Sequence, residues 1–341
     1  MASEDEEIFE RIDAGQAAGR RVALATVIRT WGSAPRRAGS HMAIDEDGGF
    51  TGSVSGGCVE AEVVRAAREV AASGAPRVLE FTVSDTDAWQ VGLACGGQVQ
   101  VYVERCAPTP VYAALRAARA ARQAVALLTR TSDGAQALVG AGETSGTLAL
   151  SAAVVEEART RRARGDSGVL ASDPALFVRC HVPPPRLFII GAVHIAEALH
   201  AVARVAGFEV SVIDPRAAFA ASQHFASIGV VDEWPDAALR RLAPDAGSAV
   251  VALTHDPKLD DPALAVALRS PAFYVGALGS RRTHAQRLER LAAQGLAAEA
   301  QRIHAPVGLD LGGRSAGEIA VAIMAEIIQV RARPGRLSPA S

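Results

Sequence analysis

The rhythm of hydrophobic and polar positions changes about halfway along the chain. After residue 186, short apolar runs alternate with helical patterns. Strands are predicted at 187–190, 209–214, 248–254 and 272–275, and helices at 194–206, 262–269, 281–293 and about 315–331. Regular alternation of this kind predicts a parallel sheet wrapped by helices. The C-terminal part of this α/β chain is therefore predicted to be a Rossmann-like, doubly wound parallel-sheet domain.

Before residue 181 the pattern is less regular. Helices are predicted at 6–18, 59–72 and 111–123, and strands at 22–29, 41–45, 77–82 and 98–104, with further short strands around 124–150. This mixture is typical of an α+β domain. Three consecutive prolines in the segment 181–186 remove backbone donors and force an extended chain. We predict an N-terminal domain at 1–180, a C-terminal domain at 187–333 and a proline-rich linker at 181–186.

Composition limits the classes of function. The 341 residues are 49% hydrophobic, which suits two globular domains. The net charge is −2 and the charges are interspersed, so neither a nucleic-acid partner nor a membrane partner is expected. The acidic N-terminus does not resemble a secretory signal, and we expect a cytoplasmic protein. The four cysteines lack zinc-like spacing and are expected to be reduced thiols.

Two loops combine cysteine with paired glycines. Cys58 stands where a glycine-rich loop meets a predicted helix, whose first N–H groups attract anions and favour the thiolate. Glu60 is interpreted as a favourable charge for the helix dipole. Cys95 belongs to a second such loop. The predicted cofactor-binding residues of the two loops are Gly52, Ser53, Ser55, Gly56, Gly57, Gly96 and Gly97. The alternative is that both cysteines only pack at glycine turns.

A third glycine turn opens the second domain. Gly191 follows a predicted strand and His194 begins a helix, while Asp214 ends the next strand at the spacing of a ribose-binding acid. Val193 occupies the position where a bound pyrophosphate needs glycine, so NAD(P) binding is doubtful. Close strand–helix packing explains Gly191 and Ala196 equally well, and capping of its own turn explains Asp214 equally well.

Three later loops also follow predicted strands, at the edge where ligands bind in such sheets. The first contains His255, the second contains Gly279 and Ser280, and the third runs from His304 to Gly312. Each alone is explained by turn chemistry, but their shared placement favours a joint site. Several residues are interpreted as structural, surface or partly buried: His41, His200, His224, His284, Cys106 and Cys180.

In this order the motifs resemble the XdhC/CoxI family, accessory proteins of molybdenum hydroxylases such as xanthine dehydrogenase and carbon monoxide dehydrogenase. The matching segments are 32–36, 52–60, 95–97, 191–196, 214–216, 254–256, 274–280 and 306–310. The resemblance implies a two-domain, often dimeric protein that binds molybdenum cofactor (a molybdopterin) and assists the exchange of an oxo for a sulfido ligand. It also implies delivery to the apoenzyme, with a cysteine desulfurase as sulfur donor. Val193 departs from the family's Gly-x-Gly-His turn.

The chemistry of the cofactor is compatible with these residues. An anionic pterin phosphate with a sulfur-bound metal needs phosphate donors and a soft ligand. We favour molybdenum contact by Cys58, supported by Cys95, over persulfide relay. A cofactor-binding chaperone is favoured over a turnover enzyme. The alternatives are an NAD(P)-dependent oxidoreductase and a protein-interaction scaffold. The apolar helix at 319–328 predicts burial in a core or in a homodimer interface.

Overall fold

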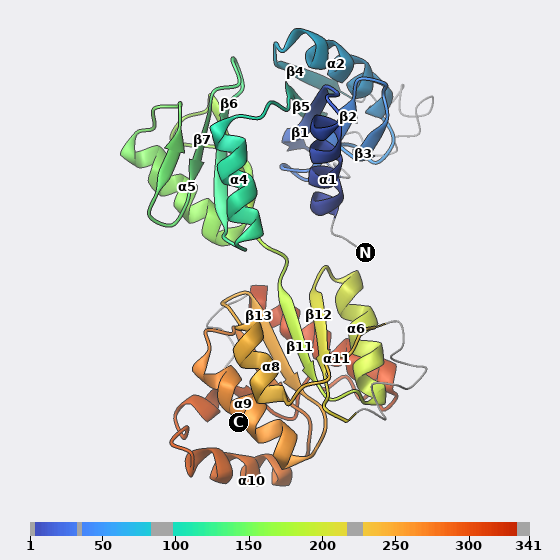
Figure 1. The fold of residues 1–341 in the computed structure, drawn as a ribbon, viewed down its shortest axis with the longest axis vertical. Helices are drawn as coiled ribbons and strands as arrows, with labels where there is room; N and C mark the ends of the chain where they lie inside the picture. Colours follow the sequence, from blue (N-terminus) through green and yellow to red (C-terminus); the bar gives the residue numbers. More distant parts are fainter. Residues whose placement is uncertain (1–3, 33–35, 83–97, 217–227, 333–341) are drawn as a thin grey trace. The chain divides into compact units, whose positions relative to one another are not determined.

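The computed structural model describes residues 4–32, 36–82, 98–216 and 228–332 (Figure 1). The chain divides into two compact units, Met1–Pro183 and Pro184–Ser341, and the division falls inside the proline-rich segment. Strand β10 ends at His181 and strand β11 begins at Arg186. The connecting segment is therefore limited to residues 182–185. Each unit is described by itself.

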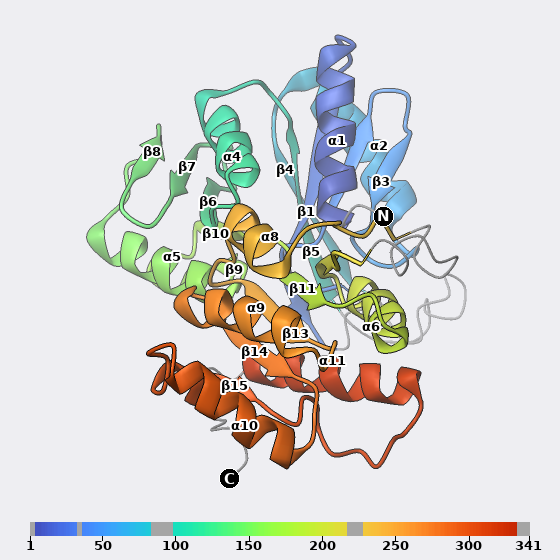
Figure 2. The same cartoon turned by 60° about the horizontal axis from the view of Figure 1, so that its bottom comes forward.

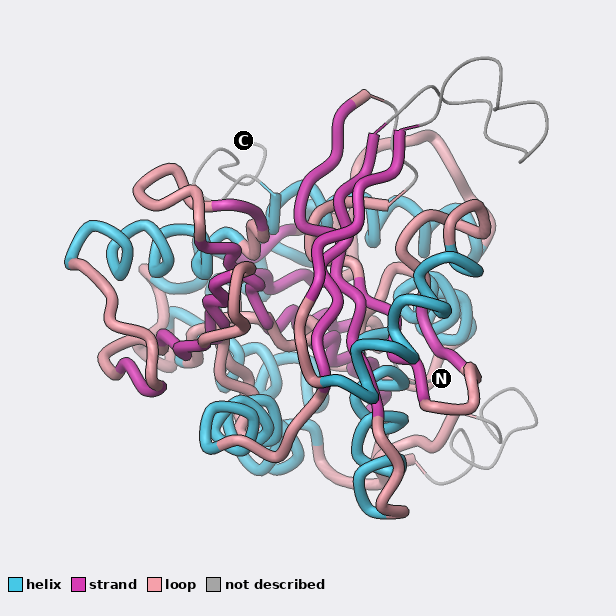
Figure 3. Tube along the Cα trace, turned by 90° about the horizontal axis from the view of Figure 1, so that it is seen from above, coloured by secondary structure: helices cyan, strands magenta, loops and turns pink. Residues whose placement is uncertain are grey.

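The first unit begins with an antiparallel sheet of order β3-β2-β1-β5-β4, whose strands run side by side in Figure 3. Alternate residues of β1 point to opposite faces. Ala23, Ala25 and Val27 pack under α2, whereas Val22 and Leu24 pack under α1. Burial of both faces explains why β1 is apolar almost throughout. The elements are α1 (Glu4–Ala17), β1 (Val22–Trp31), β2 (His41–Asp45), β3 (Phe50–Gly52), α2 (Glu60–Ser73), β4 (Arg77–Thr82) and β5 (Gln98–Arg105).

A second antiparallel sheet, of order β8-β7-β6-β10-β9, completes the first unit. The sequence predicted the short strands around 124–150, but not helix α5, strand β9 or strand β10. The middle of this sheet is the pairing of β10 with β6, which joins segments far apart in the chain. Local periodicity carries no information about such pairing. The elements are α4 (Pro110–Ala120), β6 (Val125–Arg130), β7 (Gln136–Val139), β8 (Thr144–Gly146), α5 (Ala152–Arg164), β9 (Gly168–Val169) and β10 (Leu176–His181).

The second unit is a parallel sheet of order β12-β11-β13-β14-β15. A parallel bridge between Ile213 and Val231 extends it beyond β12, which gives the strand order of dinucleotide-binding folds. One buried cluster includes Leu199 of α6 and Ile323 of α11, and the other includes Leu239 of α8 and Leu264 of α9. Helices therefore cover both faces (Figure 2), and the predicted Rossmann-like fold class is confirmed.

The bounds of most elements in this unit are close to those that the sequence predicts. Helix α8, the 3-10 helix η1 and strand β15 were not anticipated, and α9 begins at Pro257, earlier than predicted, with Pro262 inside it. The elements are β11 (Arg186–Ile190), α6 (His194–Val205), β12 (Glu209–Ile213), α8 (Pro235–Leu242), β13 (Ser248–Ala252), α9 (Pro257–Arg269), β14 (Tyr274–Ala277), α10 (Arg281–Ala292), the 3-10 helix η1 (Glu299–Arg302), β15 (Ile303–His304) and α11 (Ala316–Ala332).

The apolar character of α11 is explained mainly by the core of its own unit. Ile323, Met324 and Ile327 pack in the same cluster as α6, while Val321 and Ile328 are exposed. The helix therefore does not by itself indicate a dimer interface. Within the described ranges, none of the helices combines the length and the hydropathy needed to cross a membrane.

Candidate functional site

The glycine-rich loop folds around the carboxylate of Glu60, the first residue of α2. One carboxylate oxygen, Oε1, accepts hydrogen bonds from the Ser53 hydroxyl at 2.7 Å and from the N–H groups of Val54 and Ser55 at 3.3 and 3.0 Å. The other, Oε2, accepts from the Ser55 hydroxyl at 2.5 Å and from the N–H groups of Gly57 and Val59 at 3.0 and 3.2 Å. Glu60 is thus an internal anion at the start of the helix.

The remaining amides of the loop are also satisfied within the protein. The N–H of Gly56 donates to the Ser53 hydroxyl, and that of Cys58 donates to the Ser55 hydroxyl. Burial alone would raise the pKa of Glu60, but the hydrogen bonds from Ser55 and Ser53 outweigh it and lower the pKa to about 2. The carboxylate is therefore ionised at neutral pH. In this arrangement the N–H groups of the loop bind Glu60, whereas the sequence pattern suggested that they bind a ligand.

Glycines let this loop pass close to the neighbouring strand. Gly52 has a φ of 91°, and a Cβ atom there would lie 2.4 Å from the carbonyl oxygen of His41. Gly56 and Gly57 also have positive φ values, and both are exposed. Cys58 follows them and is partly exposed. The loop is therefore a fixed turn that carries a thiol next to the start of α2.

The other cysteines differ in their surroundings. Cys95, Gly96 and Gly97 lie outside the described residues, so their predicted role stays a prediction. Cys180 is buried on β10, where its thiol donates to the Asp166 carbonyl oxygen, and burial raises its pKa to about 11. Burial also raises the pKa of the Cys106 thiol. Both thiols are therefore poor nucleophiles.

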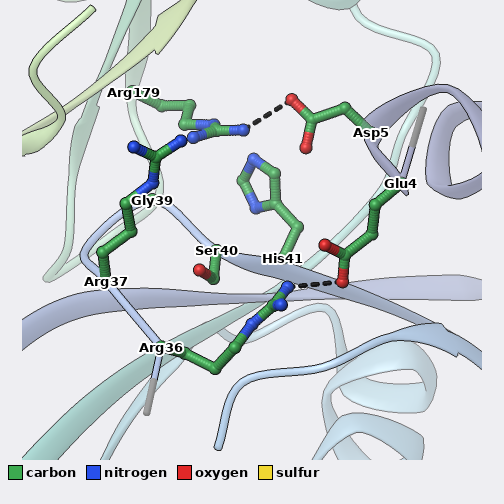
Figure 4. A pocket seen from close by; sticks show the side chains of 8 residues that line it. All are labelled: Glu4, Asp5, Arg36, Arg37, Gly39, Ser40, His41 and Arg179. Carbon is green, nitrogen blue, oxygen red and sulfur yellow. Dashed lines mark hydrogen bonds and ion pairs between the residues drawn. The ribbon is translucent and has the colours of Figure 1, made fainter. Parts of the chain in front are cut away.

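A polar pocket of about 240 Å³ lies at the N-terminal end of α1, beside the glycine-rich loop (Figure 4). The Arg36 guanidinium connects the two, because its Nε donates to the Ser53 carbonyl oxygen at 3.1 Å while its Nη2 forms an ion pair with Glu4. Arg179 of β10 pairs with Asp5 at 2.6 Å. The residues that line the pocket are Glu4, Asp5, Arg36, Arg37, Gly39, Ser40, His41 and Arg179.

Two buried histidines join the two sheets next to this pocket. His41 on β2 and His181 on β10 are stacked with ring centroids 6.2 Å apart. From the sequence, His41 was interpreted as a structural or surface residue, and it is in fact 4% exposed with its Nδ1 3.0 Å from the Thr26 hydroxyl. Burial and then the charges of Arg179 and Arg119 hold the pKa of His41 well below its ordinary value. His41 is therefore neutral at physiological pH.

In the second unit the parallel register brings the predicted residues to one edge of the sheet. Gly191 follows β11 with a φ of 102°, and a Cβ atom there would lie 2.4 Å from Cγ2 of Thr254. The N–H of Ala192 donates to Asp214 at 2.7 Å, and Asp214 also pairs with Arg216 at 2.7 Å. The Asp214 side chain is fully buried, and its carboxylate holds both the Gly191 turn and the Arg216 side chain in place.

The other loops at this edge are held by internal contacts. His194 is exposed at the start of α6, and His255 is exposed with a left-handed φ of 62°. Ser280 caps α10 by accepting from the N–H of Thr283, directly after Gly279, whose φ is 136°. His304, in contrast, is buried and 2.9 Å from Glu326. Ligand binding by these loops stays a prediction.

A buried ion pair underlies the same edge and was not anticipated. Thr254 donates its hydroxyl to Asp260 at 2.6 Å, and Arg287 lies 3.8 Å from Asp260. Arg287 also donates to the Leu278 carbonyl oxygen, just before Gly279. This pair therefore ties two of the loops together. Its residues gave no sequence signal because they lie on two helices, α9 and α10.

Comparison with known proteins agrees with this architecture. Residues 187–327 match the family model described as the XdhC Rossmann domain, and residues 16–82 match that of the XdhC and CoxI family. The chain is 29% identical over 315 residues to the molybdenum cofactor insertion chaperone PaoD of Escherichia coli K12, covering 92% of this chain and 84% of that protein. It is 26% identical over 315 residues to a protein of Bacillus subtilis 168 described as a probable xanthine dehydrogenase subunit, covering 91% and 93%.

The same fold occurs in a crystal structure described as a xanthine dehydrogenase from Bacillus halodurans. The two chains align with a TM-score of 0.74 at 24% sequence identity, covering 99% of this chain and 98% of that one. The two family models match separate parts of the chain, one in each unit. The chain belongs to the XdhC and CoxI family, as its motifs predicted.

Proposed function

We propose that this protein binds molybdenum cofactor as a cargo and delivers it to the apoenzyme of a molybdenum hydroxylase, such as xanthine dehydrogenase or carbon monoxide dehydrogenase. Two findings on relatives support this role. One relative is named as a molybdenum cofactor insertion chaperone and another as a probable xanthine dehydrogenase subunit. Both align along most of their length with this chain. The role is that of a carrier, and no turnover of the cofactor is required of it.

The observation that carries the proposal is the presentation of Cys58. Glu60 and the serine hydroxyls satisfy the amides around it, and the partly exposed thiol is the soft ligand that this fixed turn carries. Thiolates suit sulfur-rich metal centres. Among the described residues no group of three or more His, Cys, Asp or Glu side chains could hold a metal ion. The cargo's own dithiolene would therefore hold molybdenum, and Cys58 would add one thiolate.

Maturation of the cargo belongs to the same proposal. While the cofactor is held at Cys58, sulfide replaces the oxo ligand, which takes up two protons and leaves as water. A cysteine desulfurase supplies the sulfur as a persulfide, and a thiol reductant provides the two electrons that convert it to sulfide. Cys95, from the second cysteine and glycine loop, supports the contact. The working form is a homodimer that docks on the apoenzyme.

The test is the molybdenum and pterin content of protein purified from a host that makes the cofactor. Cys58→Ala is expected to lower molybdenum per chain at least about tenfold, since one metal contact is lost. The fold should persist, because removing one sulfur atom at a partly exposed turn costs no more than about 1 to 2 kcal/mol. Pterin fluorescence after acid oxidation measures the organic part of the cargo independently.

Cys106→Ala is the matched control, since it removes an identical group from a thiol whose pKa is raised by burial. Molybdenum and pterin content should be unchanged in it. Equal molybdenum in Cys58→Ala and wild type would refute the contact. If only Cys95→Ala loses molybdenum, the metal contact is assigned to the second cysteine and glycine loop, and the carrier role is retained.

A further inference from the structure

The pocket at the start of α1 has more positive charge than its own acids neutralise. Arg36 pairs with Glu4, and Arg179 pairs with Asp5. Arg37 forms no ion pair with any residue that the structure describes. Its guanidinium lies beside that of Arg179 in Figure 4, and after burial its charge contributes to lowering the pKa of Arg179. Two neighbouring guanidinium groups repel each other unless an anion lies between them.

His41 presents a second unsatisfied group to the same pocket. Its Nδ1 is close to the Thr26 hydroxyl, but its Nε2 is buried and has no hydrogen-bond partner in the described part of the chain. A buried polar group without a partner costs about 1 to 3 kcal/mol. When Thr26 donates to Nδ1, the proton of the neutral ring is on Nε2. The ring, which lies between Arg179 and Arg36 in Figure 4, then offers a donor to an oxyanion.

The absence of a side chain at Gly39 leaves room in the pocket for the Arg179 guanidinium. Gly39 has a φ of 89°, and a Cβ atom there would lie 2.6 Å from Nη1 of Arg179. A side chain at this position would push the guanidinium out of the pocket. The cavity, at about 240 Å³, is smaller than the roughly 300 to 1,000 Å³ of sites that enclose a drug-sized ligand. It therefore suits one small charged group of a larger molecule.

We propose that Arg36, Arg37, Arg179 and His41 form a receptor for a phosphate-ester or diphosphate group, and that Glu4 and Asp5 occupy it as internal counter-ions when it is empty. Arginine is the side chain best matched to phosphate oxygens, because its fork of N–H groups binds two of them at once. The receptor adjoins the Cys58 loop through Arg36 and Ser53. It rests on the proposed function only for the identity of the molecule that carries the phosphate.

The carboxylates of Glu4 and Asp5 can move away from their arginine partners when a ligand binds. The side chains of Glu4 and Asp5 are 49% and 37% exposed, respectively, and both belong to the first turn of α1. Rotation of either carboxylate into water exposes its arginine without moving the helix. Bound phosphate and bound acid are therefore alternatives, and removal of an acid should strengthen phosphate binding.

The experiment is calorimetric titration of the full chain with inorganic phosphate and pyrophosphate. Arg37→Ala is expected to weaken pyrophosphate binding at least about tenfold, as the loss of a charge-assisted contact does. Asp5→Asn is expected to strengthen it about fivefold, since one competing charge is gone. Arg65→Ala, which removes an exposed arginine on α2, is the matched control and should bind as wild type does.

Absence of saturable pyrophosphate binding in both wild type and Asp5→Asn would overturn the proposal, as would an Arg37→Ala affinity equal to that of Arg65→Ala. Unchanged affinity in Asp5→Asn would overturn the counter-ion part. Cytidine monophosphate and adenosine diphosphate distinguish the sources: tighter binding than their inorganic counterparts indicates a nucleotide, and equal binding indicates the phosphate alone. If the protein binds pyrophosphate but never carries molybdenum, the phosphate receptor is supported and the proposed molybdenum cofactor cargo is refuted.

Discussion

Glu60→Gln is the substitution that most directly tests how the glycine-rich loop is held. It keeps the size and shape of the side chain and removes only its charge and one acceptor oxygen. In the native loop each carboxylate oxygen accepts two backbone N–H groups and one serine hydroxyl. An amide nitrogen in place of either oxygen would face two backbone N–H donors, which cannot rotate away as the serine hydroxyls can.

The magnitude follows from the groups left unpaired. With the amide nitrogen at the Oε2 position, the N–H of Val59 can still reach the Ser55 hydroxyl at 3.1 Å, but the N–H of Gly57 loses its acceptor. Gly57 is exposed, so water can reach its N–H, and the cost is the loss of one hydrogen bond to a charged group, about 1.5 to 3 kcal/mol. Loss of the negative charge at the start of α2 adds about 0.3 to 1 kcal/mol. We expect Glu60→Gln to lower the free energy of unfolding by about 3 kcal/mol.

The assay is urea unfolding followed by circular dichroism between pH 7 and pH 3. Because the pKa of Glu60 is lowered from 4.5 to about 2 in the folded protein, its contribution is full above pH 4.5 and is lost as the pH falls through about 2. The difference in the free energy of unfolding between wild type and Glu60→Gln should therefore be constant near neutral pH and become smaller in acid.

Glu62→Gln is the control, since Glu62 is also in the first turn of α2 but is exposed beside Arg65. Its effect should stay within about 0.5 kcal/mol. A Glu60→Gln protein as stable as Glu62→Gln at pH 7 would refute the view that an internal anion organises the loop. A difference that grows in acid would refute the assigned direction of the pKa shift.

Two further predictions concern the second unit and the assembly. Wild-type protein should show no micromolar binding of NAD(H) or NADP(H) by calorimetry, because Val193 is the N-cap residue of α6, where a pyrophosphate would approach. Val193→Gly should strengthen any binding of these nucleotides. Micromolar affinity in wild type would contradict the steric argument. Light scattering at micromolar concentration should give the mass of a homodimer, and a monomer mass would exclude it.

Much of the second unit was predictable because its signals are local. Alternating apolar runs and helical patterns predicted a parallel sheet, and β11 and α6 begin within a residue of the expected positions. Gly191 and Asp214 were identified from their spacing. Spacing left both a ligand-binding and a structural role open for each, because it cannot show that Asp214 is fully buried against Arg216 or that Gly191 has to clear Thr254. Those facts depend on how neighbouring strands pack.

In the first unit, too, the sequence identified local features but not the tertiary contacts that they make. The pattern of residues 51–60 located the loop and its cysteine, since glycines, serines and a helix start are adjacent in the chain. It assigned Glu60 to the helix dipole, and only the fold shows the carboxylate turned back to bind the loop amides. That interpretation was incomplete, because a backbone donor has the same sequence signature whether it faces a ligand or an internal acid.

The arginine and histidine pocket had no sequence signature at all. Its members come from the start of α1, the β1–β2 connection, the start of β2 and β10, and two of them, Asp5 and Arg179, are 174 positions apart in the chain. Sequence alone determined the family, the fold class of the second unit and the place of Cys58, all of which depend on short-range patterns. The tertiary structure decided which charges meet, because antiparallel pairing of β10 with β6 and packing of α1 between two sheets bring distant segments into contact.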